Sequence, residues 1–416
     1  MFNNSIKLSL VFLLALASIS NINAQVESVN ISMGEDYSNQ VFYSLSNGEQ
    51  GIHASSEWDL AFDLSPFGTA IRTNGAKNTK LFLFPTGDTS SWLVVDTIGL
   101  SEWAPLYNSD TSWYTGAFNR YQSDFDIGWG NYDPITHNII GDSIYILSAP
   151  GLLKKIWIEG LIDGAYIFRY ANLDGTEEEV IEIEKGDYFG KNFVYFDLTN
   201  NELIDIEPSS VDWDIVFTKY VSEVAPGFYY GVTGALINQG AQVAKAYPVS
   251  NPNNYSEYQD ESFSGQLNGI GYDWKEFDLT SGEYIIVDSV CFFVQDLAGD
   301  IWRLFFTGFD GSASGDISFE QELLSAQTSI EENGKEINFA LYPNPAQNSL
   351  NVLFDSEYRN TYVSILDISG SVVYQTEGTA VSFNNLQIDI NGLPSGIYMV
   401  NVVSGETSQV LQFVKQ

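Results

Sequence analysis

The chain has 416 residues, and 54 acidic against 17 basic residues give it a net charge of −37 at neutral pH. A surface of this sign repels phosphate backbones, which argues against nucleic acid as a partner. Hydrophobic residues make up 44% and aromatic residues 14% of the sequence, so we expect two or three packed domains rather than a disordered chain.

The first 24 residues have the pattern of a cleavable signal peptide. Lys7 is the only charge before an apolar run between Leu8 and Ala17, which is shorter than the roughly 20 residues that span a bilayer. Small and polar residues follow as far as Ala24 and Gln25, where we predict cleavage. We therefore expect entry into the Sec translocon and a mature chain that starts near Gln25. No later segment is long and apolar enough for a membrane helix.

The region from residue 37 to residue 320 is predicted to be all-β and internally duplicated. Strand-forming residues cluster in short runs that Asn, Asp and Gly interrupt. A series of landmarks recurs in the same order in two halves, and its clearest pair is Glu57–Phe62 and Asp212–Phe217. Such an ordered series predicts two tandem antiparallel β units, at residues 25–188 and 189–322.

The residues that the two halves share are interpreted mainly as structural. Trp58 and Trp213 are expected to be core anchors, since each buries a large apolar surface. Asp59 and Asp214 alternate to the opposite face of their strands and are expected to bond neighbouring backbone. The single cysteine, Cys291, lies in an apolar run and is predicted to be buried. With no internal disulfide, stability must come from packing.

Three segments carry a resemblance to a known family: Tyr37–Leu45, Trp58–Phe62 and Ile71–Gly75. Together they resemble the HmuY family, which comprises secreted or lipid-anchored all-β haem-binding proteins of Gram-negative bacteria. The resemblance extends over residues 37–320, more faintly in the second half. It implies two tandem HmuY-like units and makes haem the cofactor to look for.

Haem iron needs axial ligands, and the mature chain offers few of them. The candidates are His53, shortly before the Trp58 strand, His137, in the segment Tyr132–Asn138, and the methionines Met33 and Met399, the latter in the C-terminal region. The two histidines are the ones we single out. Both are expected to be exposed loop residues. The second unit contains neither His nor Met. If haem binds, the first unit must therefore supply the iron ligands.

Motifs of enzyme chemistry are absent from the sequence. We find no nucleophile elbow, zinc-protease pair or phosphate-binding glycine loop, so we do not expect an enzyme. A glycosidase carboxylate pair remains an alternative, because 54 acidic residues allow many arrangements. Trp103, Trp113 and Trp129 would stack on sugars or flat ligands if exposed, but are interpreted as core residues. The identity of any bound metal is left open.

The C-terminal part has a different residue pattern. Gln327–Glu336 is polar and charged, so residues 323–340 are predicted to form a linker. Residues 341–416 alternate cleanly between apolar and polar positions, with Gly or Pro in the turns. This pattern predicts a small antiparallel sandwich of immunoglobulin-like size.

The start Leu341–Asn348, the turn Asp367–Gly370 and the segment Leu393–Tyr398 resemble the type A C-terminal sorting domain of the type IX secretion system. The resemblance implies recognition by the outer-membrane secretion machinery, removal of the domain and attachment of the cargo to surface lipopolysaccharide. It places the protein outside the cell or on the outer surface of a Gram-negative bacterium. The residues expected to carry the export signal are Pro343, Asn344, Pro345, Gly370, Leu393, Pro394, Gly396, Tyr398 and Lys415.

The sequence as a whole favours a secreted or cell-surface binding protein, with haem or another flat hydrophobic ligand as the expected class. Two alternatives stay open. One is a structural or adhesive surface protein without a small-molecule site, and the other is a carbohydrate-acting enzyme.

Overall fold

The computed structural model describes residues 26–65, 67–85, 88–120, 125–188, 190–326, 339–354, 361–367, 371–375, 385–404 and 407–416. The predicted signal peptide, its cleavage site at Ala24 and Gln25, and Gly370 lie outside these residues. The all-β prediction is confirmed, because the described elements are antiparallel strands and short 3-10 helices. Among them is no helix with the length and apolar character needed to cross a membrane.

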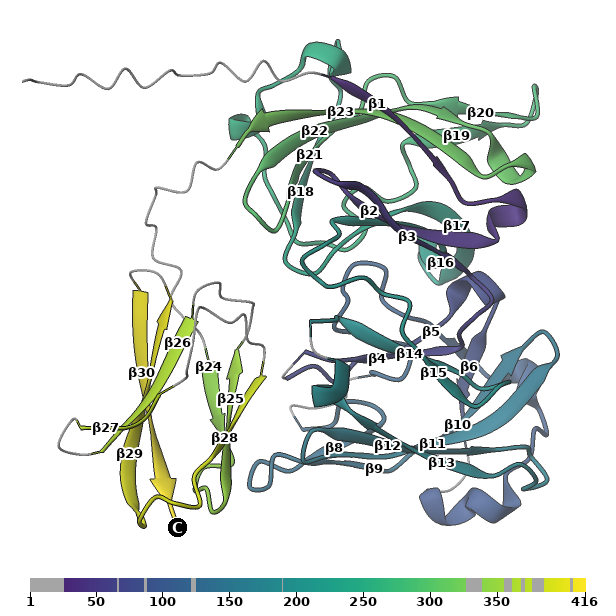
Figure 1. Ribbon diagram of the computed structural model, residues 1–416. Coiled ribbons are helices and arrows are strands. Elements are labelled where there is room, and N and C mark those ends of the chain that lie inside the picture. Colours follow the sequence, from purple (N-terminus) through teal and green to yellow (C-terminus); the bar gives the residue numbers. More distant parts are fainter. Residues whose placement is uncertain are drawn as a thin grey trace, which may run out of the picture.

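The strands before the sorting region form two lobes, each made of two packed sheets (Figure 1). In the first lobe the sheet β15-β14-β4-β5 packs against the sheet β13-β12-β11-β10-β6-β7, which β8 and β9 extend. Its strands are β4 (Leu60–Asp63), β5 (Ile71–Thr73), β6 (Lys80–Leu83), β7 (Pro105–Leu106), β8 (Gly130–Tyr132), β9 (Ile139–Gly141), β10 (Ile144–Ala149), β11 (Leu152–Ile162), β12 (Ala165–Ala171), β13 (Glu179–Glu184), β14 (Phe193–Asp197) and β15 (Glu202–Ile204).

The second lobe packs the sheet β17-β16-β2-β3 against the sheet β1-β23-β22-β21-β18, with a small β19-β20 hairpin beside them. Its strands are β1 (Glu27–Ser32), β2 (Asn39–Ser44), β3 (Gly48–Ala54), β16 (Ile215–Ala225), β17 (Phe228–Ile237), β18 (Gln242–Ala246), β19 (Lys275–Asp278), β20 (Glu283–Ile286), β21 (Cys291–Gln295), β22 (Ile301–Phe309) and β23 (Asp316–Ser325). Cys291 is buried in this lobe, as predicted.

Short 3-10 helices connect strands in both lobes. They are η1 (Glu35–Tyr37), η2 (Gly75–Lys77), η3 (Thr89–Val94), η4 (Leu100–Glu102), η5 (Lys185–Tyr188), η6 (Pro252–Asn254), η7 (Tyr258–Asp260) and η8 (Gly311–Ala313).

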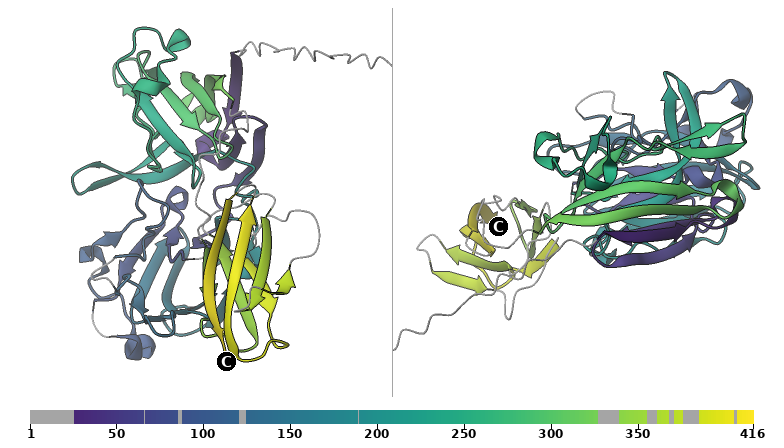
Figure 2. Two further views of the ribbon diagram at one scale, coloured as in Figure 1. Left: turned by 90° about the vertical axis from the view of Figure 1, so that its left-hand side faces the viewer. Right: turned by 90° about the horizontal axis from the view of Figure 1, so that it is seen from above.

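The sheets do not follow the predicted boundary between units 25–188 and 189–322. β1 pairs with β23 and β2 pairs with β16, so the N-terminal strands complete the second lobe (Figures 1 and 2). The first lobe is completed instead by β13, on β12, and by β14, on β4. The unpaired N–H and C=O groups of an edge strand can bond to any strand that lies beside them, so the order of strands in the chain does not decide the partner. The first lobe is therefore continuous in sequence, and the second is closed by the start of the chain.

The pairing of β2 with β16 and the pairing of β14 with β4 have the same register, and an aspartate side chain holds each pair through a hydrogen bond to the partner backbone. In the second lobe Asp214 Oδ2 accepts a hydrogen bond from the Leu45 backbone N–H at 2.8 Å. In the first lobe Asp59 Oδ2 accepts one from the Leu198 N–H at 2.9 Å. Both aspartates are buried. The prediction that Asp59 and Asp214 bond neighbouring backbone is confirmed, and the backbone in question comes from the other half of the chain.

The C-terminal region is a separate sandwich of the sheets β24-β25-β28 and β27-β26-β29-β30, with its own core. Both ends of the predicted linker lie in strands, because β23 continues to Ser325 and the first strand of the sandwich begins at Phe339. The strands are β24 (Phe339–Tyr342), β25 (Ser349–Phe354), β26 (Thr361–Asp367), β27 (Val372–Gln375), β28 (Asn385–Asp389), β29 (Gly396–Ser404) and β30 (Thr407–Lys415).

The crossed pairing predicts which fragments fold. Residues 57–208 contain both sheets of the first lobe and are expected to fold alone, with a cooperative urea transition. The matched fragment 25–188 corresponds to the sequence repeat but lacks β14 and β15, and it also lacks β23 and β16, the partners of β1 and β2. We expect it to show no cooperative transition and rapid proteolysis. The opposite result for the two fragments would contradict the pairing.

Candidate functional site

The structure places the two histidines in different lobes. His53 lies on β3, with its Nδ1 3.9 Å from Glu57 Oε2 and its side chain 30% exposed, so the expectation of an exposed loop position was wrong. His137 lies in the turn between β8 and β9, is exposed, and contacts the Tyr132 hydroxyl through Nδ1. The described residues bring no three of the His, Cys, Asp and Glu side chains together as a metal site. The two predicted haem ligands therefore do not share a site in this fold.

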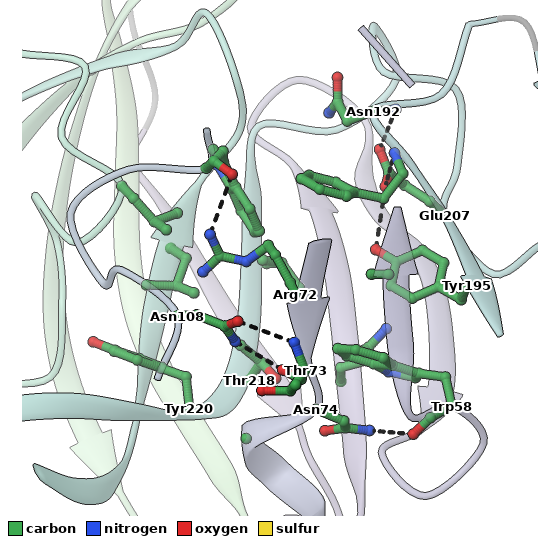
Figure 3. Close-up of a pocket in the computed structure, with 18 of the residues that line it drawn as sticks. Trp58, Arg72, Thr73, Asn74, Asn108, Asn192, Tyr195, Glu207, Thr218 and Tyr220 are labelled. Atoms are coloured by element: carbon green, nitrogen blue, oxygen red, sulfur yellow. Dashed lines mark hydrogen bonds between the residues drawn. The ribbon is translucent and has the colours of Figure 1, made fainter. Parts of the chain in front are cut away.

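A cavity of about 80 Å³ lies where the two lobes meet (Figure 3). Small-molecule pockets usually enclose roughly 300–1,000 Å³. An engineered cavity of roughly 150 Å³ accommodates one benzene ring. The cavity between the lobes therefore suits a compact group of a few heavy atoms and is too small for a planar macrocycle. The residues that line it include Phe42, Trp58, Arg72, Asn108, Ser109, Asp110, Tyr195, Glu207, Trp213, Lys219 and Tyr220.

The landmark tryptophans line this cavity from opposite lobes. Trp58 packs edge-on against Tyr195 at a centroid distance of 5.0 Å, and Trp213 packs against Phe42 in the same way at 5.1 Å. In each pair the tryptophan belongs to one half of the sequence, and its partner lies on a strand, β14 or β2, that comes from the other half. Trp213 is a buried member of a hydrophobic cluster, as predicted, and Trp58 packs partly buried against another; both tryptophans line the cavity at the junction of the lobes.

Arg72 is a buried cation at the cavity. Its guanidinium donates to the carbonyl oxygens of Ser112 at 2.9 Å and Ser109 at 2.8 Å, and it lies 5.0 Å from the centre of the Trp113 ring. Burial lowers the pKa of Arg72 to about 10, so it stays charged at neutral pH. In the sequence Arg72 stands within the motif Ile71–Gly75, and an arginine inside a strand run is the signal that marks it.

Glu207 is a buried carboxyl group on the same cavity, and the sequence analysis did not single it out. It accepts hydrogen bonds from the Asn192 N–H at 2.9 Å, the Phe193 N–H at 3.1 Å and the Tyr195 hydroxyl at 3.2 Å (Figure 3). Burial raises the pKa of Glu207 to about 7, although these donors partly stabilise its charge. Both oxygens are occupied, so Glu207 holds β14 in place.

An aromatic surface adjoins the cavity. Tyr107, after β7 of the first lobe, stacks on Tyr229 of β17 with a centroid distance of 4.3 Å and an interplanar angle of 19°. Phe228 and Tyr230 precede and follow Tyr229 on β17, so their side chains lie on the other face of the strand, where they are 59% and 61% exposed. Ser222, opposite Tyr230 in the hairpin, donates to Asp110, which lines the cavity. We call the stacked pair of Tyr107 and Tyr229 the aromatic surface.

The three tryptophans interpreted as core residues belong to hydrophobic clusters or pack against them, as predicted. Trp129 is fully buried in the first-lobe core, and Trp103 packs against Phe84 at 6.0 Å. Trp113 joins the lobes, since its indole N–H donates to the Ile237 carbonyl at 2.8 Å. The exposed aromatic surface is formed by other residues, which the sequence analysis missed.

Comparison with known proteins assigns the C-terminal sandwich. Residues 340–416 match the model of the secretion system C-terminal sorting domain. The chain is exported by the type IX secretion system. Its location is accordingly the cell surface or the surrounding medium. No curated protein matches the chain.

Among solved structures, the chain matches PorZ of Porphyromonas gingivalis, described as an essential bacterial surface component of the type IX secretion system. The identity is 11% over 66% of this chain, and the TM-score is 0.16. The match spans 56% of the length of PorZ. A likeness at this level supports no argument about the fold or the role of the two lobes.

Within the sorting domain, the predicted signal residues join its first and last segments. Asn344 accepts a hydrogen bond from the Val414 N–H at 2.9 Å and donates to the Gln412 carbonyl at 3.1 Å. The Tyr398 hydroxyl donates to the Pro394 carbonyl at 2.8 Å. The remaining described members, Pro343, Pro345, Leu393, Gly396 and Lys415, lie in the turns or at strand ends.

The buried Glu207 predicts a pH dependence of stability. The folded state keeps its proton up to about pH 7, whereas the unfolded chain loses it near 4.5. The folded state thus binds more protons in this window, and the free energy of unfolding falls as pH rises through it. In Glu207→Gln this decline should be smaller by on the order of 3 kcal/mol. Urea unfolding at several pH values checks this, with the exposed Glu202→Gln as control. An unchanged slope in Glu207→Gln would contradict it.

Proposed function

We propose that this exported chain is a non-enzymatic carbohydrate-binding protein of the outer cell surface of a Gram-negative bacterium, and that it holds its ligand on the aromatic surface. The observation that carries the proposal is the stack of Tyr107 on Tyr229 across the two lobes, in which Tyr229 is 40% exposed. Flat aromatic faces stack on the apolar faces of sugar rings. Exposed aromatic residues gathered in one place are also typical of binding surfaces.

Polar groups next to the aromatic surface suit hydroxyl-bearing ligands. Asp110 and Lys219 line the adjoining cavity and lie on opposite lobes. Cross-lobe hydrogen bonds hold these groups in position, from the Leu267 N–H to the Thr111 carbonyl at 3.0 Å and from Asn192 to Asn238 at 2.7 Å. A rigid surface of this kind loses little conformational entropy on binding.

The enzyme alternative has less support from the geometry. A glycosidase needs one carboxylic acid that can give its proton to the substrate. Glu207 has the raised pKa of such an acid, but backbone N–H groups and Tyr195 occupy both of its oxygens. Asp110 accepts from Ser222. We therefore propose that the residues around Glu207 and Asp110 bind a ligand and do not catalyse a reaction.

The export route is proposed in more detail from the resemblance of both ends. A signal peptide over residues 1–24 would direct the chain through the Sec translocon. The sorting domain would then be removed, and the cargo attached to surface lipopolysaccharide. The polar segment between β23 and β24 is where such a removal would separate lobes and sorting domain.

The aromatic surface is tested by a double variant. In the mature chain, Tyr107→Ala with Tyr229→Ala should lower affinity for glycans found on an array by about tenfold, because two stacking rings are lost. Phe277→Ala, an exposed aromatic residue on the β19-β20 hairpin, is the matched control and should leave binding unchanged. Binding to no glycan class, or an equal loss in the control, would contradict the proposal.

The haem hypothesis, and with it an HmuY-like activity, stays a prediction with its own test. Because His53 and His137 lie in different lobes and the cavity is small, we expect no saturable Soret shift on titration of the mature chain with haem. His53→Ala and His137→Ala are titrated in parallel. A shift that one of these variants abolishes would establish an iron ligand and overturn the carbohydrate proposal as the main function.

A further inference from the structure

The cavity between the lobes is lined by two cations, of which Arg72 donates to four backbone carbonyl oxygens. Arg72 and Lys219 come from opposite lobes, and in the described part of the chain neither takes part in an ion pair. Arg72 is 7% exposed, so its charge is largely removed from water. A buried cation without a counter-ion is costly. In a chain of net charge −37, an unpaired cation pair at one place is unexpected.

The same cavity presents polar atoms without hydrogen-bond partners. Trp58 Nε1, Trp213 Nε1 and the Tyr220 hydroxyl are buried, and no group of the described residues bonds to them. Trp213 and Tyr220 are 2% and 9% exposed. An indole N–H can only donate, and each unsatisfied buried donor costs free energy. Figure 3 shows Tyr220 on one side of Arg72 and Trp58 on the other.

The lining compensates Arg72 in part, because its guanidinium donates to four backbone carbonyls and the Asp110 carboxylate counteracts the lowering of its pKa, but it leaves the indole and hydroxyl groups without partners. Glu207 accepts from two backbone N–H groups and from Tyr195, and Asp110 accepts from Ser222. The lining therefore retains unpaired donors at Trp58, Trp213 and Tyr220, together with Lys219, which forms no ion pair among the described residues. Its complement is a compact group that only accepts hydrogen bonds and carries negative charge.

We propose that the cavity between the lobes binds the anionic substituent, a carboxylate or a sulfate, of an acidic sugar. The inference rests on the proposed carbohydrate binding and names its substrate class. Either substituent has only a few heavy atoms, which an 80 Å³ cavity accommodates, whereas a whole sugar ring does not fit. The ring then lies outside, where the aromatic surface adjoins Asp110 at the cavity.

The net charge of the chain and the local charge of the cavity act on an anionic ligand in opposite directions. The net charge of −37 repels a densely charged polyanion as it approaches. A single buried anion beside Arg72 and the indole donors is screened little by salt. The site is thereby suited to glycans with isolated acidic sugars rather than to highly charged polymers.

The test follows the indole N–H resonances of the mature chain by proton–nitrogen correlation NMR. The signals of Trp58 and Trp213 are assigned from Trp58→Phe and Trp213→Phe, which keep an aromatic ring and remove the donor. Glucuronate and a sulfated monosaccharide should shift both signals, and glucose should shift neither. The arm that gives the larger shift identifies the substituent. Unshifted indole signals with both anions would overturn the inference.

Affinity provides the second readout, by calorimetry with a glucuronate-containing oligosaccharide. Lys219→Gln and Trp213→Phe should each weaken binding by about tenfold, and the exposed Lys80→Gln should not. If acidic and neutral oligosaccharides bind equally and the variants change nothing, the inference fails while the carbohydrate proposal stands. If glucuronate shifts the indole signals but the aromatic variants bind glycans normally, the aromatic surface is wrong and the anion site stands.

Discussion

The hydrogen bond from the Leu45 backbone to the Asp214 carboxylate holds the start of the chain in the second lobe, and much of the structure depends on it. It fixes β2 on β16 in one register, while its counterpart at Asp59 fixes β14 on β4. Hydrogen bonds to a charged acceptor contribute about 1.5–3 kcal/mol each, and more is lost if a buried carboxylate is left unpaired. Both lobes therefore depend on strands delivered from elsewhere in the sequence.

The crossing of strands also creates the surface between the lobes. The connecting segments around residues 55–59 and 205–214 run from one lobe to the other, and they carry Trp58, Glu207 and Trp213 to the same place. Trp58 and Trp213, which occupy equivalent positions in the two halves, therefore line the same cavity from opposite lobes. The unpaired cations and indole donors are a consequence of this meeting, since neither lobe alone surrounds them.

Local patterns made part of this structure predictable. The sorting domain was recognised because its turns and strand ends are contiguous in sequence, and the bonding role of Asp59 and Asp214 followed from strand alternation. The pairing of the halves did not follow, because the landmarks of the two copies are alike and either copy satisfies the same register. Arg72, Asn108 and Trp213 are far apart in the chain, so no pattern of spacing could bring them together as one site.

The pairing of β1 with β23 has a consequence for the order in which the protein can form. Synthesis delivers β1 among the first strands, yet its partner Asp316–Ser325 is among the last residues of the lobes. The first lobe can close as soon as β15 has emerged, and β16 follows soon after as the partner of β2, whereas β1 must wait with an open edge through more than a hundred further residues. Such edges readily pair with other chains. In a nascent chain β1 can therefore pair with the wrong strand until β23 has emerged. A chaperone that binds unfolded chains would find its target at β1.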